Sequence, residues 1–321
     1  MMKKKAPDHR EVLKRFCIRF LLLCIALYFL INWVPSRFIE PINVYTARMC
    51  GLLLGILGLS THVHGPFVTA GGFSVKIITE CSAVFVCALF SSFVLAYPAS
   101  PRDKAFGLVF GLPLLFLVNL LRLLIVFLVG LRVPALFQAV HIYLGQIMMV
   151  LFLILACLIW LRTCGRIPLK ETPFVFLARA VLFSATPFSL WLLIDDSYVA
   201  LNTYGARVLL NLFGLGLPLS WNTGRNLNTY ASFSLVAFAT LVIATRSLDL
   251  QTKLRGLLFG SGALAVVYFL YEAHKMLYAG LSAGVALIPF VGLIIANQWV
   301  LPFALWLFLV RRDLFRQASV N

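Results

Sequence analysis

Three apolar stretches decide how this chain folds: ECSAVFVCALF at residues 80–90, NLLRLLIVFLVG at residues 119–130, and HIYLGQIMMVLFLIL at residues 141–155. Each stretch carries one polar residue of interest, namely Cys81, Arg122 and His141. A thiol, a guanidinium and an imidazole are all costly inside or at the edge of a bilayer, so each needs a reason to be there. These three residues are therefore the first candidates for a functional site.

The composition indicates a membrane protein. Of the 321 residues, 62% are hydrophobic and 12% are charged, whereas soluble chains carry about 25% charged residues. Several apolar runs approach the length of about 20 residues that spans a bilayer as a helix. The formal charge of +16 comes from Lys and Arg clustered between alternate apolar runs, as in cytoplasmic loops. The lipid bilayer, and not nucleic acid, is the expected partner of this charge.

The pattern predicts an all-α polytopic integral membrane protein with about eight transmembrane helices. Placing both termini in the cytoplasm puts 17 of the 27 Lys and Arg residues on the inner side and seven on the outer side. Residues 49–59 read as an interfacial or re-entrant helix, and residues 62–80 as an extended segment outside the membrane. The predicted spans are residues 16–34, 81–97, 105–129, 141–161, 174–194, 232–245, 256–273 and 291–310.

The two halves of the chain resemble each other. YTARMCGLLLGILGLS, from Tyr45, is similar to TYGARVLLNLFGLGLP, from Thr203, and KAFGLVFG, from Lys104, is similar to KLRGLLFG, from Lys253. Copies of four spans each would be parallel repeats, although apolar low complexity can imitate a repeat. Arg122 falls opposite Tyr271, so the second copy lacks the polar set. The predicted domains are a cytoplasmic basic N-terminus (1–15), a catalytic transmembrane domain (16–170) and a second four-helix region without catalytic residues (171–321).

The predicted topology brings the three polar residues to one membrane face. Cys81 and His141 each open a span at the outer surface, and Arg122 lies roughly 10 Å below the outer end of its span. A nearby cation favours the reactive thiolate, an imidazole can relay its proton, and a guanidinium can stabilise an oxyanion. Seven cysteines with no zinc-type spacing predict no metal site and no cofactor. Cys50 and Cys81 are the two cysteines on the outer side, which leaves a disulfide open.

Three further residues support this site. Asn119 lies one helical turn before Arg122, where it can orient the guanidinium or bind a substrate amide. Gly145 lies one turn after His141 and allows a neighbouring helix or peptide to approach closely. Glu80 can orient His141, or it can simply sit at a helix N-terminus where an acid is favourable.

Taken in order, these motifs resemble the exosortase/archaeosortase family of membrane cysteine transpeptidases. The resemblance rests on Cys followed by two small residues, then NxxR, then HxxxG, and covers residues 71–161. It implies that Cys81 is the nucleophile, Arg122 the transition-state stabiliser and His141 the acid/base. It also implies substrates that end in a sorting tail of a short motif, a hydrophobic helix and a basic cluster. Many members carry Gly where this chain has Ala83, after the Cys-Ser pair.

The sequence thus predicts a cysteine protease or transpeptidase in the cytoplasmic (inner) membrane. It would cleave the C-terminal sorting tail of exported proteins at the outer face through a thioester on Cys81. Two alternatives stay open: a transporter that uses Arg122 as an anion site, and a non-catalytic assembly factor of the cell envelope. Loss of the Cys81 thiol would abolish the activity of a cysteine transpeptidase but not that of either alternative.

Overall fold

The computed structural model describes residues 9–33, 35–164, 171–214, 232–280 and 300–315. The chain divides into two compact units. The first comprises Met1–Leu177 with Leu314–Asn321, and the second Ala178–Asp313.

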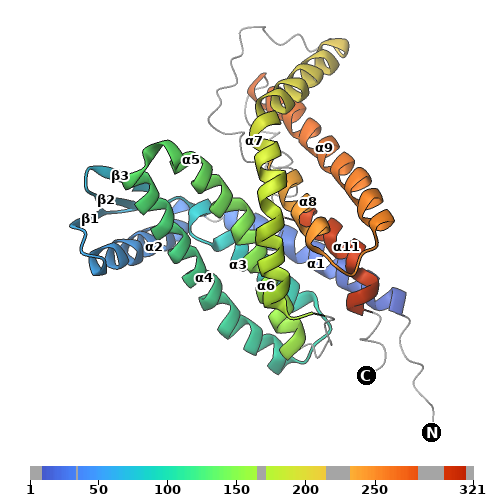
Figure 1. The fold of residues 1–321 in the computed structure, drawn as a ribbon, viewed down its shortest axis with the longest axis horizontal. Helices are drawn as coiled ribbons and strands as arrows, with labels where there is room; N and C mark the ends of the chain where they lie inside the picture. Colours follow the sequence, from blue (N-terminus) through green and yellow to red (C-terminus); the bar gives the residue numbers. More distant parts are fainter. Residues whose placement is uncertain (1–8, 34, 165–170, 215–231, 281–299, 316–321) are drawn as a thin grey trace. The chain divides into compact units, whose positions relative to one another are not determined.

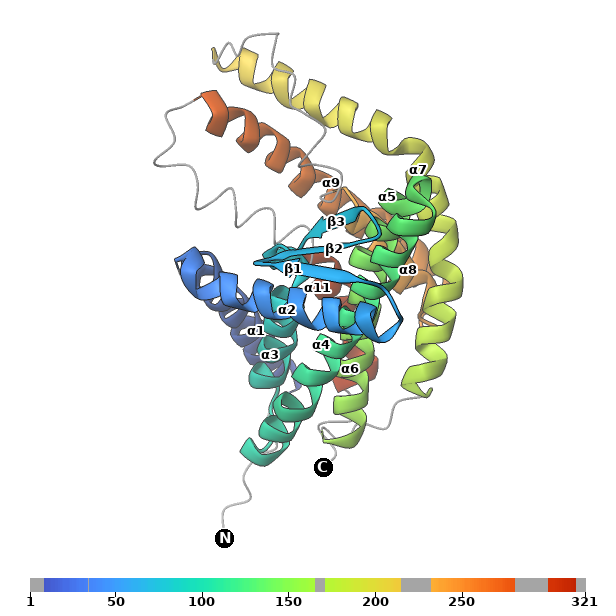
Figure 2. The ribbon, with the colours of Figure 1, turned by 90° about the vertical axis from the view of Figure 1, so that its left-hand side faces the viewer.

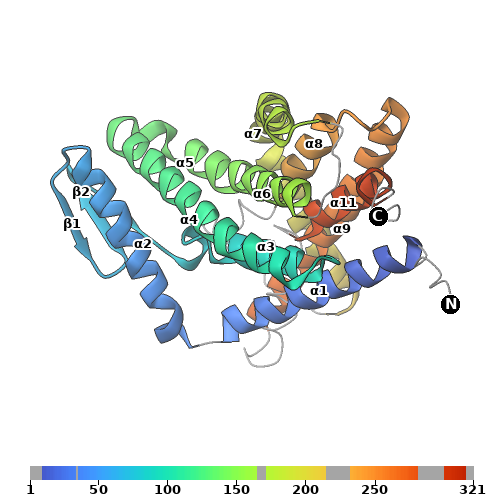
Figure 3. The same cartoon turned by 90° about the horizontal axis from the view of Figure 1, so that it is seen from below.

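The first unit is a helical bundle with a small sheet at one end (Figures 1 and 3). α1 packs on α3, α3 packs on α4 and α6, and α4 also contacts α2 and α5. An aromatic cluster of Phe16, Phe93, Tyr97 and Trp160 joins α1, α3 and α6 through edge-to-face ring contacts. The helices are α1 (His9–Trp33), α2 (Ser36–Ile56), α3 (Val84–Ala96), α4 (Pro101–Arg132), α5 (Pro134–Ile142), the π-helical turn η2 (Tyr143–Met148) and α6 (Met149–Thr163).

The predicted extended segment forms a three-stranded antiparallel sheet. Its strands β1 (Thr61–His64), β2 (Phe67–Ala70) and β3 (Phe73–Lys76) lie in the order β1-β2-β3. Gly71 and Gly72, both with positive φ, make the two-residue turn between β2 and β3. Strands β1 and β2 pack on α2 (Figure 2), which fixes the sheet to the bundle.

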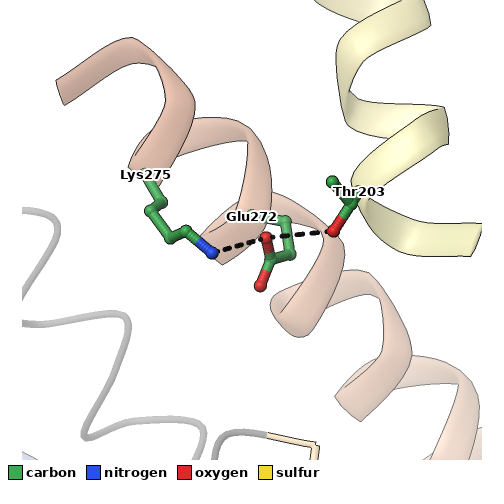
Figure 4. A network of polar contacts seen from close by, with 3 residues as sticks. All are labelled: Thr203, Glu272 and Lys275. Carbon is green, nitrogen blue, oxygen red and sulfur yellow. Dashed lines mark hydrogen bonds and ion pairs between the residues drawn. The ribbon is translucent and has the colours of Figure 1, made fainter. Parts of the chain in front are cut away.

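The second unit is built on α7 (Pro173–Leu212, which begins in the first unit), α8 (Ser234–Ala244), α9 (Leu250–Gly280) and α11 (Leu301–Phe315). α8 packs against α9. Glu272 of α9 is fully buried, and its Oε2 accepts from Thr203 Oγ1 of α7 at 3.4 Å and pairs with Lys275 Nζ at 3.1 Å (Figure 4). This ion pair compensates a charge that would otherwise be expensive at this depth.

The α3–α4 hairpin of the first unit and the α8–α9 hairpin of the second each contain the same two kinds of internal contact. Lys104 Nζ donates to the carbonyl of Leu95 at the end of α3, and Lys253 Nζ donates to the carbonyl of Ile243 at the end of α8. In each case the lysine neutralises the negative end of the preceding helix.

The second shared contact lies two turns further along each hairpin. The backbone of Gly111 in α4 lies against the ring of Phe90 in α3, and that of Gly260 in α9 lies against the ring of Phe238 in α8. Lys104 and Gly111 are the first and last residues of KAFGLVFG, and Lys253 and Gly260 are those of KLRGLLFG. The similar sequences therefore make similar hairpins.

The helices confirm an all-α membrane protein. Four of the described segments are long and apolar enough to cross a membrane: Pro101–Arg132, Pro134–Thr163, Pro173–Leu212 and Leu250–Leu277. Shorter apolar helices cover Val84–Ala96, Ser234–Ala244 and Leu301–Val310. The count of eight spans and the orientation of the termini stay predictions.

Two predicted element boundaries are wrong. The helix expected at residues 49–59 is the much longer α2, which continues through Pro41 although proline lacks the N–H of a helical hydrogen bond. The span expected to end near residue 194 continues as the 40-residue α7, since no strong helix breaker follows Pro187 in it. The segment from Thr203 is therefore helical. Residues 291–299 of the last predicted span lie outside the described residues.

Candidate active site

Cys81 lies in a tight turn that leads into α3. The sequence predicted that Cys81 opens the helix, and this prediction is wrong. Cys81 ends a short 3₁₀ turn (η1, Thr79–Cys81), and α3 begins only at Val84. Between them, Ala83 has φ of 64°, the one positive φ of any described non-glycine residue. A left-handed conformation costs an alanine about 1–2 kcal/mol, which is why glycine suits this position. The bend separates the thiol from the helix and leaves Cys81 buried at 7% exposure.

Two buried hydrogen bonds connect Cys81 to Arg122. Asn119 Nδ2 donates to the main-chain carbonyl of Cys81 at 2.8 Å, and Arg122 Nη1 donates to Asn119 Oδ1 at 3.2 Å. Asn119 is fully buried and Arg122 is 7% exposed. Both the nitrogen and the oxygen of the Asn119 amide are thus hydrogen-bonded within the protein, which favours an orienting role over substrate binding. Among the residues that the structure describes, none accepts a hydrogen bond from Arg122 Nε.

Gly145 provides the surface against which the guanidinium lies. A Cβ added at Gly145 would stand 3.9 Å from Arg122 Cζ and 4.0 Å from Nη2. Gly145 belongs to the π-helical turn η2, which joins α5 to α6. π-helical turns widen a helix locally and recur at functional sites. Gly145 therefore meets the guanidinium directly and lets this helix approach α4.

His141 lies within a helix and not at its head, so the predicted position at the start of the span is wrong. Pro134 starts α5 in the first-turn position that proline favours, and His141 follows about two turns later, just before the π turn. Its ring stacks on that of Phe137, with centroids 5.6 Å apart and planes 17° apart. This contact of residues four apart on one helix holds the imidazole plane.

Cys81 and His141 line the same cavity, which has a volume of about 190 Å³. Its wall is mostly apolar and comes from α2, the sheet, the segment that leads from the sheet to Cys81, α4 and α5. Arg122 is not part of this wall and reaches the site through Asn119 and the Cys81 carbonyl. The lining residues are Cys50, Val68, Val75, Lys76, Ile77, Ile78, Cys81, Leu123, Val126, Phe127, Phe137 and His141.

Cys50 lines this cavity, whereas Glu80 does not. Glu80 is exposed in η1 and does not line the cavity. This position fits an acid at the start of a helical turn better than a residue that orients His141. Cys50 of α2 does line the cavity and belongs to the same buried cluster as Cys81, and both thiols are free. Burial raises the pKa of the Cys50 thiol to about 11, so Cys50 is a poor nucleophile at neutral pH.

Sequence reasoning missed most of the cavity wall. Phe137 could have been found, because it precedes His141 by one helical turn. Val75 and Ile77 alternate along the extended segment and face the cavity together. The contribution of Cys50 carried no sequence signal beyond its predicted outer position.

Comparison with known proteins gives one match. Residues 9–161 fit the family model described as Transmembrane exosortase (Exosortase_EpsH). Neither the search of curated proteins nor the search of solved structures returned a match. The matched residues include every helix and strand that contributes to the cavity.

Proposed function

The chain belongs to the transmembrane exosortase family through residues 9–161, and from this premise we propose that it is a membrane cysteine transpeptidase with Cys81 as nucleophile. Family membership suggests a membrane transpeptidase role. The observation that carries the specific proposal is the buried hydrogen-bonded series from Arg122 through Asn119 to Cys81, beside a cavity that Cys81 shares with His141.

Cys81 forms the covalent bond to the substrate, and His141 transfers the proton. His141 accepts the thiol proton, and the sulfur attacks the carbonyl carbon of the scissile peptide bond. The tetrahedral intermediate collapses as the C–N bond breaks, and His141 returns the proton to the leaving amine. The product is a thioester on Cys81, which an amine, a hydroxyl or water then resolves.

Arg122 stabilises the negative charge that forms on the carbonyl oxygen during attack. Its guanidinium is buried and held by Asn119, and its Nε–H is not used by any residue in the described part of the chain. A preorganised cation in a site of low dielectric is worth more than in water, because it does not have to reorganise during the reaction. Gly145 keeps that position open.

The substrates are exported proteins with a C-terminal sorting tail, processed at the outer face of the cytoplasmic membrane. The excess of Lys and Arg on alternate loops supports this orientation. With both termini in the cytoplasm, the sheet and the cavity lie on the outer side.

The second unit is a degenerate copy of the first four-helix module and serves as scaffold. The matching lysine and glycine contacts of the α3–α4 and α8–α9 hairpins support this duplication. Tyr271 stands where the first copy has Arg122. Chemistry is therefore confined to residues 16–170.

The test is tail removal from a tailed substrate co-expressed with wild-type protein or with Cys81→Ala, Arg122→Ala, Arg122→Lys or His141→Ala. Gel shift and mass spectrometry follow the cleavage, and immunoblotting of membranes controls for protein level. We expect no cleavage with Cys81→Ala and a hydroxylamine-sensitive acyl adduct on the wild-type protein.

The alternatives predict different responses of the protein's own activity to the same substitutions. Unchanged processing by Cys81→Ala at a normal membrane level would refute thiol chemistry. A transporter would survive loss of Cys81 but not of Arg122, and an assembly factor would tolerate all four substitutions.

A further inference from the structure

The sheet of the first unit ends in a strand whose outer edge is free of strand partners in the described residues. β3 pairs only with β2. The two-residue turn at Gly71-Gly72 makes Ala70 and Phe73 the first hydrogen-bonded pair, so the next such pairs are Val68 with Val75 and Pro66 with Ile77. The bond from Ile77 N to the Pro66 carbonyl, at 2.8 Å, fits this alternation. The main-chain groups of Ser74 and Lys76 therefore point away from β2.

This edge leads directly to the nucleophile. Four residues separate Lys76 from Cys81, and Cys81 N donates to the carbonyl of Ile78 within that connection. Phe73 anchors the far end of the strand against Phe127 of α4, with ring centroids 5.3 Å apart. The edge thus keeps a fixed position relative to Cys81.

The cavity lies along one face of the same strand. Val75 and Ile77 line it together with Cys81 and His141, and Lys76, although exposed, also contributes to its wall, while Ser74 is exposed and does not line it. At about 190 Å³ it is smaller than the 300–1,000 Å³ pockets that hold drug-sized ligands. It suits one apolar side chain and not a folded segment.

We propose that the substrate residues preceding the scissile bond bind as a fourth strand, added in parallel to the outer edge of β3, and insert one apolar side chain into this cavity. The proposal rests on the proposed transpeptidase function. Residues after the scissile bond belong to the membrane-spanning tail, so the segment available to the sheet is the one before it. Main-chain bonds at Ser74 and Lys76 supply affinity, as in other strand-addition complexes, and the cavity supplies side-chain selectivity.

The first experiment compares Ser74→Pro with Ser74→Ala. Proline removes the outward N–H but no bond to β2, and edge strands tolerate it. Alanine keeps the N–H and removes only the hydroxyl, which accepts from Thr69 Oγ1 at 2.9 Å. We expect processing with Ser74→Pro to be at least tenfold slower than with Ser74→Ala, at equal membrane levels.

The second experiment does not depend on how well the proline variant folds. Ser74→Cys is introduced into the Cys81→Ala protein, and single cysteines are placed at successive substrate positions before the scissile bond. Disulfide cross-linking should peak at every second substrate position, as the alternation of a strand requires. His62→Cys on β1, the opposite edge strand, is the matched control and should not cross-link.

Failure of this inference can be distinguished from failure of the proposed function. Normal processing by Ser74→Pro, or cross-linking without alternation, would overturn strand addition while Cys81→Ala remained inactive. Processing that survives Cys81→Ala would instead overturn the transpeptidase itself.

Discussion

Asn119 gives the sharpest test of how the site is held together. Replacing it with leucine keeps the size of the side chain but removes the bonds to the Cys81 carbonyl and to Arg122 Nη1. A neutral buried hydrogen bond contributes about 1 kcal/mol and one to a charged group about 1.5–3 kcal/mol. Because Asn119 is fully buried, water cannot replace either bond. If about 3 kcal/mol of this falls on the transition state, processing slows by roughly 100-fold, at 1.36 kcal/mol per tenfold.

The assay is the initial rate of tail removal with purified protein in lipid nanodiscs, at several substrate concentrations. The loss should appear in kcat more than in KM, since Asn119 positions the groups of the site and does not line the cavity. Ser92→Ala is the matched control, because Ser92 is equally buried and its hydroxyl donates to the Ala88 carbonyl away from the site. An Asn119→Leu rate within threefold of wild type, at equal protein level, would refute the reasoning.

Four further outcomes follow from the geometry. Ala83→Gly should raise the free energy of unfolding by about 1 kcal/mol by relieving the left-handed alanine, measured by thermal unfolding in detergent; no gain would argue against the strained turn. Gly145→Ala should process normally, since its Cβ would stand 3.9 Å from Arg122 Cζ, whereas Gly145→Leu should lose at least tenfold; equal rates would mean that the guanidinium does not rest there. Gly111→Ala should destabilise the protein by about 1–3 kcal/mol, because its Cβ would overlap the Phe90 ring, and an unchanged melting temperature would contradict that packing. The alkylation rate of Cys50 should rise about tenfold per pH unit from pH 7 to 10, because burial raises its pKa to about 11 and the reactive thiolate increases with pH below that value; peptide mass spectrometry of the Cys81→Ala protein would measure it, and a plateau near pH 8 would be inconsistent with the buried thiol.

The sequence was sufficient for the family, the membrane class and the grouping of Cys81 with His141. Apolar runs and their spacing are local signals, and the alternation of Lys and Arg between them predicts which ends of the helices share a face. The paired glycines and alternating Val and Ile residues likewise predicted the extended segment that became the sheet.

The details of the site depended on local backbone geometry that periodicity does not report. Ala83 adopts a conformation typical of glycine, so nothing in its side chain predicted the turn that separates Cys81 from α3. A helix-period pattern continues unbroken through residues 134–163, which hid both the earlier start at Pro134 and the π turn. The cavity wall assembles residues from α2, the sheet, α4 and α5, and such contacts between distant segments cannot be read from spacing along the chain.

The π turn at residues 143–148 sets the phase between two helices that read as one. A π turn accommodates one residue more than an α-helix would over the same rise, and each α-helical residue turns the chain by about 100°. Deleting a single residue from this turn would restore a continuous α-helix without shortening it by a full turn. If all the residues of this turn became α-helical instead, His141 and Phe137 would rotate by about 100° relative to α6, out of the cavity wall. The π conformation of this turn therefore sets the position of the imidazole, because it holds one more residue than an α-helix could hold here without rotating the site.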